Sequence, residues 1–468
     1  MCGRLLRVKP SSPVKLTLLA IAWPIFVEQS LRILIGTVDT FMVAHVSDGA
    51  VAALGVSNRL IVVGLICFNF IGVGTSVVIT HHLGAKDPKG AEAIARAAVG
   101  VNTWTGLIAS VVVYFLARPI LRLMQLPESL MVYAVPFLTM MGGTLFLESI
   151  NIALSASLRA HAYTRDVMFV TVGQNVLNII GNCLLLFGLF GLPKMGVEGV
   201  ALSSVCSRIA ANIALHLLVR RRLGLRLRAP DFFHLPFRRI DRILHIGLPA
   251  AGENLSYWLA LLTVTSFVSR LGAVPLATMA YCQQIQALVI LFSLSLGLGT
   301  EIMVGRLIGA GEFEAAYAQV LRSLRTGLIL CASGVALLAL AAPHLIGIFS
   351  HDPDVIRGGT ILLRICVVLE IGRVFNIIVI NSLRATGDVR FPVQAGAICM
   401  WLVWVPNAWF LGLHLGWSLV GVWISMTLDE WLRGILMYRR WKLRQWLPAA
   451  ERSRANAMRS IVPVVAET

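Results

Sequence analysis

The sequence SLRAHAYTRD at residues 157–166 is similar to SLRATGDVR at residues 382–390, 225 positions later. The four residues SLRA and the later arginine, Arg165 and Arg390, are identical. The same offset relates many other positions between Pro24 and Val197 to the second half of the chain. It pairs Pro24 with Pro249, Glu28 with Glu253, Gly72 with Gly297, Gly74 with Gly299, Thr75 with Thr300, Gly84 with Gly309, Asn182 with Asn407 and Gly196 with Gly421. The chain therefore contains two copies of one unit. A duplicated hydrophobic unit predicts two lobes that handle a substrate between or inside them.

The composition is that of a membrane protein. Apolar residues make up 57% of the 468 residues and charged residues 13%, with a mean hydropathy of +0.80. A bilayer-spanning helix needs roughly 20 apolar residues, and we predict twelve spans, six on each side of a basic stretch at 220–242. They cover 16–46, 50–80, 94–117, 130–157, 167–190, 196–219, 243–269, 275–305, 323–343, 358–382, 391–413 and 418–438. We expect an all-α polytopic membrane protein of two six-helix lobes.

The net charge of +17 is explained by where the basic residues lie. When Lys and Arg are assigned to alternating sides of the twelve spans, thirty fall on one side and five on the other. Cytoplasmic loops of membrane proteins carry such an excess. Both termini are therefore expected in the cytoplasm, and the basic stretches are orientation signals beside anionic lipid rather than a nucleic-acid surface.

These features predict five segments. A cytoplasmic tail covers residues 1–15, an N-lobe 16–219, a basic cytoplasmic linker 220–242, a C-lobe 243–440, and a cytoplasmic C-terminal tail 441–468. The eight cysteines form no C-x-x-C pair, and seven lie in apolar stretches, so we interpret them as buried inert thiols. No phosphate-binding glycine loop is present. We expect no catalytic residue, no enzymatic activity and no cofactor, and transport would draw on an ion gradient or a partner.

Several strings in this order and spacing resemble the MATE (multidrug and toxic compound extrusion) transporters of the multidrug/oligosaccharidyl-lipid/polysaccharide flippase superfamily. In the first half they are WPIFVEQSLRILIGTVDTFMVAHV (23–46), AVAALGVSNRL (50–60), GVGTSVVITHHLGAKD (72–87), SLRAHAYTRD (157–166) and QNVLNIIGNCLL (174–185). In the second half they are GLPAAGENLSYW (247–258), LGLGTEIMVGRLIGAGE (296–312) and NSLRATGDVR (381–390). The resemblance runs from about Leu16 to Tyr438. It implies two six-helix lobes in a V that export drug-like organic cations in exchange for Na⁺ or H⁺.

A first candidate site lies in the N-lobe. At 1.5 Å per residue, Asp39 lies roughly 35 Å along a helix that starts near Lys15. Asn178 and Asn182 are four residues apart and share a helix face, and with Ser204 they reach a similar depth on two other helices. Hard oxygen ligands suit Na⁺, and the carboxylate suits proton exchange. The family resemblance implies the N-lobe cation site at Asp39, Asn178 and Asn182. The alternative is that the asparagines bridge helices and Asp39 caps a kink.

The second copy lacks this set, because the offset puts Val264 in the place of Asp39 and Val403 in the place of Asn178. Its candidate substrate or ion carboxylates are Glu253, Glu370 and Asp429. The resemblance implies functional carboxylates in the seventh and tenth helices, which correspond to Glu253 and Glu370.

The alternative for these acids is internal pairing. In that case Glu370 binds Arg373 and Asp429 binds Arg433. A structural pair of Glu28 with Arg32 is predicted on the same grounds, and Glu301 is expected to reach the cytoplasmic edge beside Arg306.

We expect a monomeric multi-pass protein of the cell (inner or plasma) membrane, with small organic cations and membrane lipids as its partners. The first alternative function is a flippase or exporter of a lipid-linked precursor, or of a specific metabolite such as a flavin. Flippases of that superfamily usually have more spans or a basic cavity, whereas only five Lys or Arg are left at the spans here. The second alternative is a channel or receptor, which has no evident use for buried carboxylates in both halves. Polyamines also remain open as natural cargo.

Overall fold

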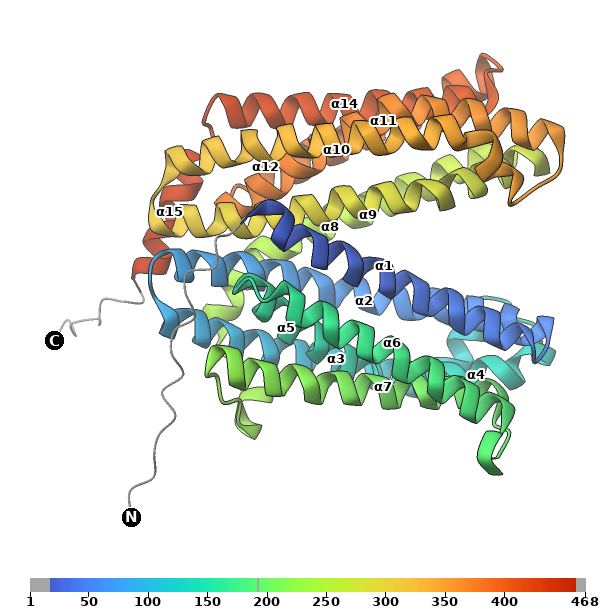
Figure 1. Cartoon of the computed structure of the whole chain (residues 1–468), viewed down its shortest axis with the longest axis horizontal. Coiled ribbons are helices and arrows are strands. Elements are labelled where there is room, and N and C mark those ends of the chain that lie inside the picture. Colours follow the sequence, from blue (N-terminus) through green and yellow to red (C-terminus); the bar gives the residue numbers. More distant parts are fainter. Residues whose placement is uncertain (1–16, 192, 460–468) are drawn as a thin grey trace.

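The computed structural model describes residues 17–191 and 193–459, and every regular element in these ranges is a helix (Figure 1). The predicted tail at 1–15 and the last nine residues lie outside the described ranges. The first half forms α1 (Leu18–Ala44), α2 (Asp48–Gly84), α3 (Pro88–Leu123), α4 (Glu128–Gly143), α5 (Leu145–Ala160), α6 (Thr164–Phe187) and α7 (Gly196–Leu218).

The second half begins after two short helical turns. The first, η2 (Val219–Leu223), overlaps the start of the predicted linker, and the second, η3 (Ala229–Phe232), lies within it. It forms α8 (Phe237–Ser269), α9 (Ala273–Ala310), α10 (Phe313–Gly347), α11 (Pro353–Thr386), α14 (Ser418–Lys442) and α15 (Leu447–Met458). Between α11 and α14, one long helix contains α12 (Arg390–Cys399), η4 (Met400–Trp404), α13 (Val405–Trp409) and η5 (Phe410–His414).

The duplication is visible in the helix positions. Helices α2, α3 and α4 begin at residues 48, 88 and 128, and helices α9, α10 and α11 begin at 273, 313 and 353, each 225 residues later. Some of these starts are fixed by capping side chains. The Asp352 carboxylate accepts a hydrogen bond from the Asp354 amide at 2.9 Å, and Pro353 follows as the first helical residue.

The two copies differ in one helix. The predicted span at 130–157 is broken into α4 and α5, which meet at a bend of 42°, whereas its counterpart α11 is continuous. The break follows Gly142 and Gly143, and the corresponding residues of α11 are Val367 and Val368. A pair of glycines weakens a helix at this point, and two valines do not.

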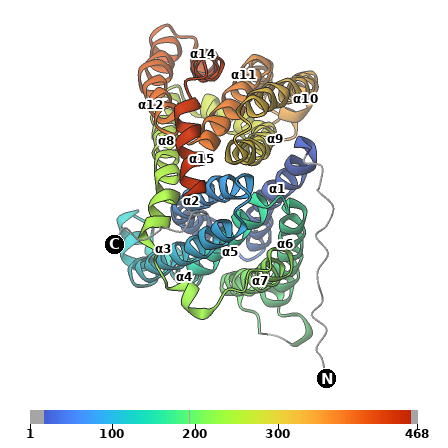
Figure 2. The same ribbon diagram turned by 90° about the vertical axis from the view of Figure 1, so that its left-hand side faces the viewer.

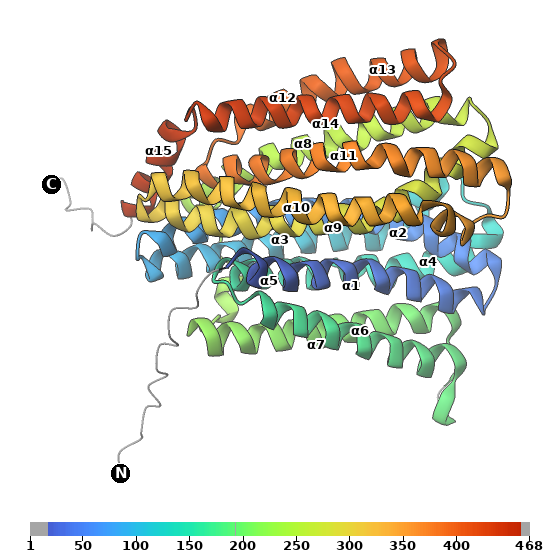
Figure 3. The same ribbon diagram turned by 45° about the horizontal axis from the view of Figure 1, so that its top comes forward.

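Within the described residues, eight helices are long and apolar enough to cross a membrane, and the bent α4–α5 pair makes a ninth. Helices α8, α11 and α14 are about as long as these candidate spans, but they carry more charged side chains than the candidate spans do. The all-helical, duplicated fold predicted from the sequence is therefore confirmed. The lobes lie one above the other in Figure 1, and Figure 3 shows the same helices running roughly parallel along the long axis.

The lobes contact each other through glycines near the end of the molecule that carries α15, here called the α15 end. A Cβ on Gly309 of α9 would lie 2.1 Å from the His81 carbonyl oxygen, and one on Gly84 of α2 would lie 2.0 Å from the Arg306 carbonyl oxygen. The His81 ring also makes a 2.7 Å hydrogen bond with the carbonyl of Ala385. Toward the opposite end the helices of the two lobes spread apart (Figure 1).

We expect Gly309→Ala to disrupt this contact. The added methyl group has no space against backbone atoms of α2, and overpacking of this kind costs about 1–3 kcal/mol. Thermal unfolding of the purified protein in detergent should show a lower midpoint. Gly334→Ala is the matched control, because nothing lies within 4 Å of its Cβ. Equal midpoints for the two variants would contradict the close approach of the lobes.

Helix α15 lies across this end within the predicted C-terminal tail, beside both lobes (Figure 2). The Ser453 hydroxyl donates to the Thr386 carbonyl at 3.0 Å, and Arg242 donates to the Asn456 carbonyl at 3.2 Å. Three alanines of α15 itself, Ala449, Ala450 and Ala457, are buried. The helix therefore joins α11 and α8 at the α15 end.

Candidate functional site

The predicted N-lobe residues form one connected group. Asp39 is buried near the end of α1 that lies away from α15, where only 8% of its surface is exposed. Its carboxylate accepts a hydrogen bond from the Asn182 amide nitrogen at 2.6 Å. The same nitrogen donates to Asn178 Oδ1 at 3.2 Å, and Asn178 Nδ2 donates to the Ser204 hydroxyl at 2.9 Å. Helices α1, α6 and α7 thus bring all four predicted side chains together.

The arrangement suits a small cation. Asp39, Asn178, Asn182 and Ser204 each supply an oxygen, and Asn182 Oδ1 is buried without a hydrogen-bond partner. Carboxylate, amide and hydroxyl oxygens are ligands for hard cations, and a buried carboxylate is also a place for a proton. Within 17–191 and 193–459 no three His, Cys, Asp or Glu side chains gather as metal ligands. The oxygen donors around Asp39 fit Na⁺ or H⁺.

Sequence reasoning missed Arg208. Its positive charge acts on Asp39, it is 9% exposed, and its Nη1 has no hydrogen-bond partner. Its Nε lies 3.4 Å from a carboxylate oxygen of Glu148. Arg208 follows Ser204 by four residues on α7, and this spacing could have indicated that both face the same site.

The C-lobe acids form a separate buried network. Glu370 is ion-paired with Arg373, and Asp429 accepts from Arg433 at 2.6 Å. Glu430, which the sequence reasoning did not select, contacts both arginines, at 3.1 Å from Arg373 Nε and 3.2 Å from Arg433 Nη2. Three carboxylates thus face two guanidinium groups, and Glu370 Oε2 and Asp429 Oδ1 have no hydrogen-bond partner. The pairs expected as the structural alternative are present, and the carboxyl groups of this network outnumber its guanidinium groups by one.

Glu253 lies outside that network. Its carboxylate accepts a hydrogen bond from Arg384 of α11 at 2.5 Å. Glu28 accepts from Arg159 of α5 at 2.7 Å. The offset of 225 relates Glu28 to Glu253 and Arg159 to Arg384, so the two lobes carry the same ion pair at the same place. The predicted Glu28–Arg32 contact is also present, at 3.3 Å.

The expectation for Glu301 was wrong. Its side chain does not extend to the edge of α9 but is 1% exposed. It makes no ion pair with Arg306, whose Nη2 donates instead to the Ala160 carbonyl at 2.9 Å. The close packing of α9 against α1, α2 and α11 leaves the side chain no path to the surface.

Comparison with known proteins identifies the family. The MatE family model matches residues 24–184 and 249–410, two ranges that begin 225 residues apart. The chain belongs to the MatE family. It is 42% identical over 431 residues to the uncharacterized transporter YisQ of Bacillus subtilis, covering 92% of this chain and 95% of that one. It is 26% identical over 428 residues to the probable multidrug resistance protein NorM of Thermotoga maritima, covering 90% and 91%.

Solved structures show the same MatE fold. An outward-facing multidrug resistance MATE family transporter of the MOP superfamily superposes with a TM-score of 0.83 at 19% identity, covering 91% of this chain and 95% of that one. A MOP superfamily transporter from Pyrococcus furiosus, whose binding pocket has a reverse polarity that suggests a different function, superposes with a TM-score of 0.83 at 20% identity, covering 93% and 96%. This MatE chain is therefore a multi-pass membrane transporter of two duplicated lobes.

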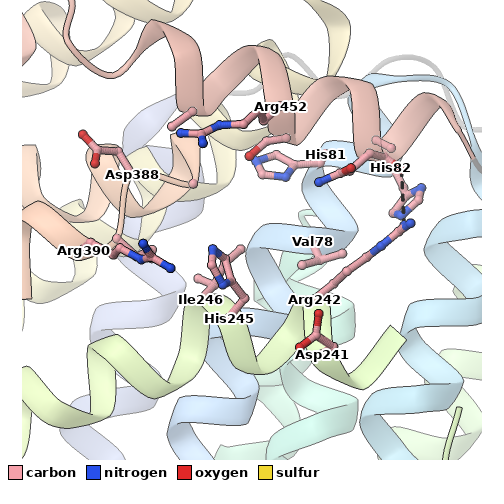
Figure 4. A pocket seen from close by; sticks show the side chains of 16 residues that line it. Val78, His81, His82, Asp241, Arg242, His245, Ile246, Asp388, Arg390 and Arg452 are labelled. Atoms are coloured by element: carbon pink, nitrogen blue, oxygen red, sulfur yellow. Dashed lines mark hydrogen bonds between the residues drawn. The ribbon is translucent and has the colours of Figure 1, made fainter. Parts of the chain in front are cut away.

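The MatE chain also has a cavity of about 400 Å³ at the α15 end (Figure 4). It lies between α2, the start of α8, the α11–α12 turn and α15. Arg242, Arg390 and Arg452 surround it from three elements, and His81 and His82 line it from α2. None of the predicted site residues lines this cavity. It is separate from the Asp39 group and from the C-lobe acids.

Proposed function

We propose that the protein is a secondary active multidrug exporter that exchanges Na⁺ or H⁺ for organic cations and other drug-like compounds by alternating access. It acts as a monomer in the cell inner membrane, with both termini in the cytoplasm. The observation that carries the proposal is Asp39, a buried carboxylate on an apolar helix whose surroundings supply further oxygens and one opposing arginine charge.

A coupling site must bind its ion in one conformation and release it in the other. Asp39 alternates between a charged form, stabilised by the Asn182 amide and the charge of Arg208, and a form neutralised by H⁺ or Na⁺. Neutralisation changes what Asn182, Asn178 and Ser204 bind, since each is hydrogen-bonded to the next. Ion binding at one residue therefore alters the contacts between α1, α6 and α7.

The buried charges favour cationic cargo. Within the helices of the described residues, eight carboxyl groups and three guanidinium groups are less than a tenth exposed. The acids are Glu28, Asp39, Glu148, Glu253, Glu301, Glu370, Asp429 and Glu430, and the arginines are Arg208, Arg373 and Arg433. Glu28 and Glu253 are paired with Arg159 and Arg384, which are slightly more exposed, so the remaining excess of acid comes from Asp39, Glu301 and the C-lobe network. An interior with an excess of acids attracts cations and repels anions, which disfavours a lipid-linked phosphate as cargo. The reverse pocket polarity of the Pyrococcus furiosus transporter suggests a different function for that protein, so polarity is a meaningful criterion in this superfamily.

The orientation can be tested by a fusion. The excess of Lys and Arg on the side of both termini predicts that the α15 end is cytoplasmic. Alkaline phosphatase fused after Thr468 should therefore be inactive, because the enzyme folds only after export. A fusion in the loop between Ala44 and Asp48 should be active. The reverse pattern would contradict the proposed orientation.

The proposed function is tested by transport in inside-out membrane vesicles. A fluorescent organic cation should accumulate inside them when a Na⁺ or an H⁺ gradient is imposed, and dissipating that gradient with a selective ionophore should release it. Imposing the two gradients separately identifies the coupling ion. Accumulation driven by neither gradient, or accumulation of an anionic dye in preference to the cation, would contradict the proposal.

A further inference from the structure

Glu301 occupies an unusual place between the lobes. It lies nine residues before the end of α9, and α9 packs against α1 and α2 of the N-lobe as well as α10 and α11 of its own. The side chain is 1% exposed, and its Oε2 is buried with no hydrogen-bond partner. Among the described residues it forms no hydrogen bond or ion pair. The corresponding residue in the first copy is Ser76, so only one lobe carries this acid.

The opposite charges that act on Glu301 come from both lobes. Glu301 is attracted by Arg159 of α5 and by Arg384 of α11. Both guanidinium groups are already engaged, Arg159 with Glu28 at 2.7 Å and Arg384 with Glu253 at 2.5 Å. Glu301 is therefore a third acid between two repeat-related ion pairs.

The two forms of Glu301 require different surroundings. An ionised carboxylate buried without hydrogen bonds is costly, whereas the protonated acid loses much less on burial. The arrangement with sealed lobes suits the protonated acid. The ionised form requires water, because Arg159 and Arg384 each stay paired within their own lobe. Separation of the lobes at the α15 end exposes Glu301 to that water.

We propose that Glu301 is a proton-binding site in the seal between the lobes, separate from the Asp39 site, that holds a proton while the α15 end is closed and releases it when that end opens. The inference rests on the proposed alternating access. Because the closed form binds one more proton than the open form, a lower pH on the α15 side favours closure and a higher pH favours opening. One such proton changes the ratio of open to closed forms by up to about tenfold per pH unit.

Other charged groups stand near this seal and must be separated from Glu301 by experiment. On the elements packed against α9 they are Glu28 of α1, His81 and His82 of α2, Glu253 of α8, Arg384 of α11 and Arg454 of α15. Arg159 of α5 also acts on Glu301. The charged residues of α10, Glu314, Arg322 and Arg325, are exposed. His161 follows α5, and burial lowers the pKa of its ring below the usual range.

Glu301 lies between the Asp39 group of the N-lobe and the acid–arginine network of the C-lobe. On the N-lobe side, Arg32 bridges Glu28 to Glu148 at 3.1 Å, and Glu148 contacts Arg208, whose charge acts on Asp39. On the C-lobe side, the charge of Glu253 acts on Arg433 of the network with Asp429 and Glu430. Contacts between acids and arginines thus run from Arg208 to Arg159 in the N-lobe and join Glu253 to Arg384 in the C-lobe, and Glu301 lies at the lobe boundary without a contact to either set.

The experiment measures opening of the α15 end directly. Thr80 is fully buried against Gly305 at the seal, so Thr80→Cys reacts with a membrane-impermeant maleimide from that side only when the lobes separate. The native cysteines are replaced by alanine. The labelling rate of Thr80→Cys is divided by the labelling rate of Glu451→Cys, which lies on the exposed face of α15. This ratio removes the intrinsic pH dependence of thiol reactivity. Rates are taken between pH 6 and 8 in proteoliposomes without a gradient or cargo.

We expect the rate ratio to rise with pH, by up to about tenfold per unit. Glu301→Gln should give a low ratio that no longer depends on pH, and Glu301→Asp should keep the rise. Glu253→Gln frees Arg384 to bind Glu301 and should move the rise to lower pH by about one unit or more. Glu314→Gln, which removes only a surface ion pair with Arg444, is the matched control and should behave as the parent does.

Two results would overturn the inference. One is an unchanged pH dependence in Glu301→Gln, which would assign the titration to another group such as His81. The other is an unshifted curve in Glu253→Gln, a test that holds even when Glu301→Gln does not fold. The labelling needs neither cargo nor coupling ion. Failure of vesicle transport with a normal labelling curve would therefore count against the proposed function alone.

Discussion

Asp39→Asn should abolish gradient-driven export while the protein still inserts and folds. The substitution keeps the size and polarity of the side chain but fixes the neutral form, so the site can no longer alternate in charge. We expect accumulation of a fluorescent cation in inside-out vesicles to fall to the level of membranes without the transporter. Thermal stability should be unchanged or higher, because removing a carboxylate from a low-dielectric site relieves a desolvation penalty.

The matched control is Asp48→Asn. Asp48 is the first residue of α2, is exposed, and lies near the same end of the molecule. The Asp48→Asn variant should accumulate the fluorescent cation as the parent protein does. Asn178→Ala should impair transport less than Asp39→Asn, because it removes one oxygen of several and leaves the Asn182–Asp39 bond. Full drug resistance conferred by a normally inserted Asp39→Asn would leave the C-lobe acids as the coupling site.

Arg373→Met should strongly destabilise the C-lobe. Arg373 is buried and contacts Glu370 and Glu430, so its loss leaves carboxylates buried without their partner. Breaking a buried ion pair from one side costs about 3–5 kcal/mol. Thermal unfolding in detergent should show a large fall in the midpoint.

The control for this variant is Arg364→Met, on the exposed side of the same helix, which should unfold near the parent temperature. Adding Glu430→Gln to Arg373→Met should recover part of the loss, because one buried charge is removed with its partner. If Arg373→Met and Arg364→Met unfold at the same temperature, the network makes no net contribution to stability.

The sequence predicts the fold well because its main signals are local or periodic. Apolar length and basic flanks predict the spans, and the offset of 225 predicts the duplication. The break between α4 and α5 was not predicted, although Gly142 and Gly143 against Val367 and Val368 carry the signal. A comparison of the two copies residue by residue would have revealed it.

For the site, the range of the contact decides what can be predicted. The pairs Glu370–Arg373 and Asp429–Arg433 follow from helix spacing, and the Asp39 group follows from depth along three helices. Glu253–Arg384 joins residues 131 positions apart, so it depends on the tertiary arrangement of α8 and α11. Glu301 was assigned to the edge of its helix because Arg306 is near in sequence, whereas tertiary packing buries it.

The central claim is that ion movement at Asp39 is coupled to movement of an organic cation. The most direct measurement is counterflow with the purified protein in proteoliposomes loaded with a pH-sensitive or Na⁺-sensitive dye. When an organic cation gradient is imposed without any ion gradient, the coupling ion should move in the opposite direction in the parent and remain still in Asp39→Asn. Organic cation movement with no ion movement in the parent, or equal ion movement in both proteins, would contradict the account.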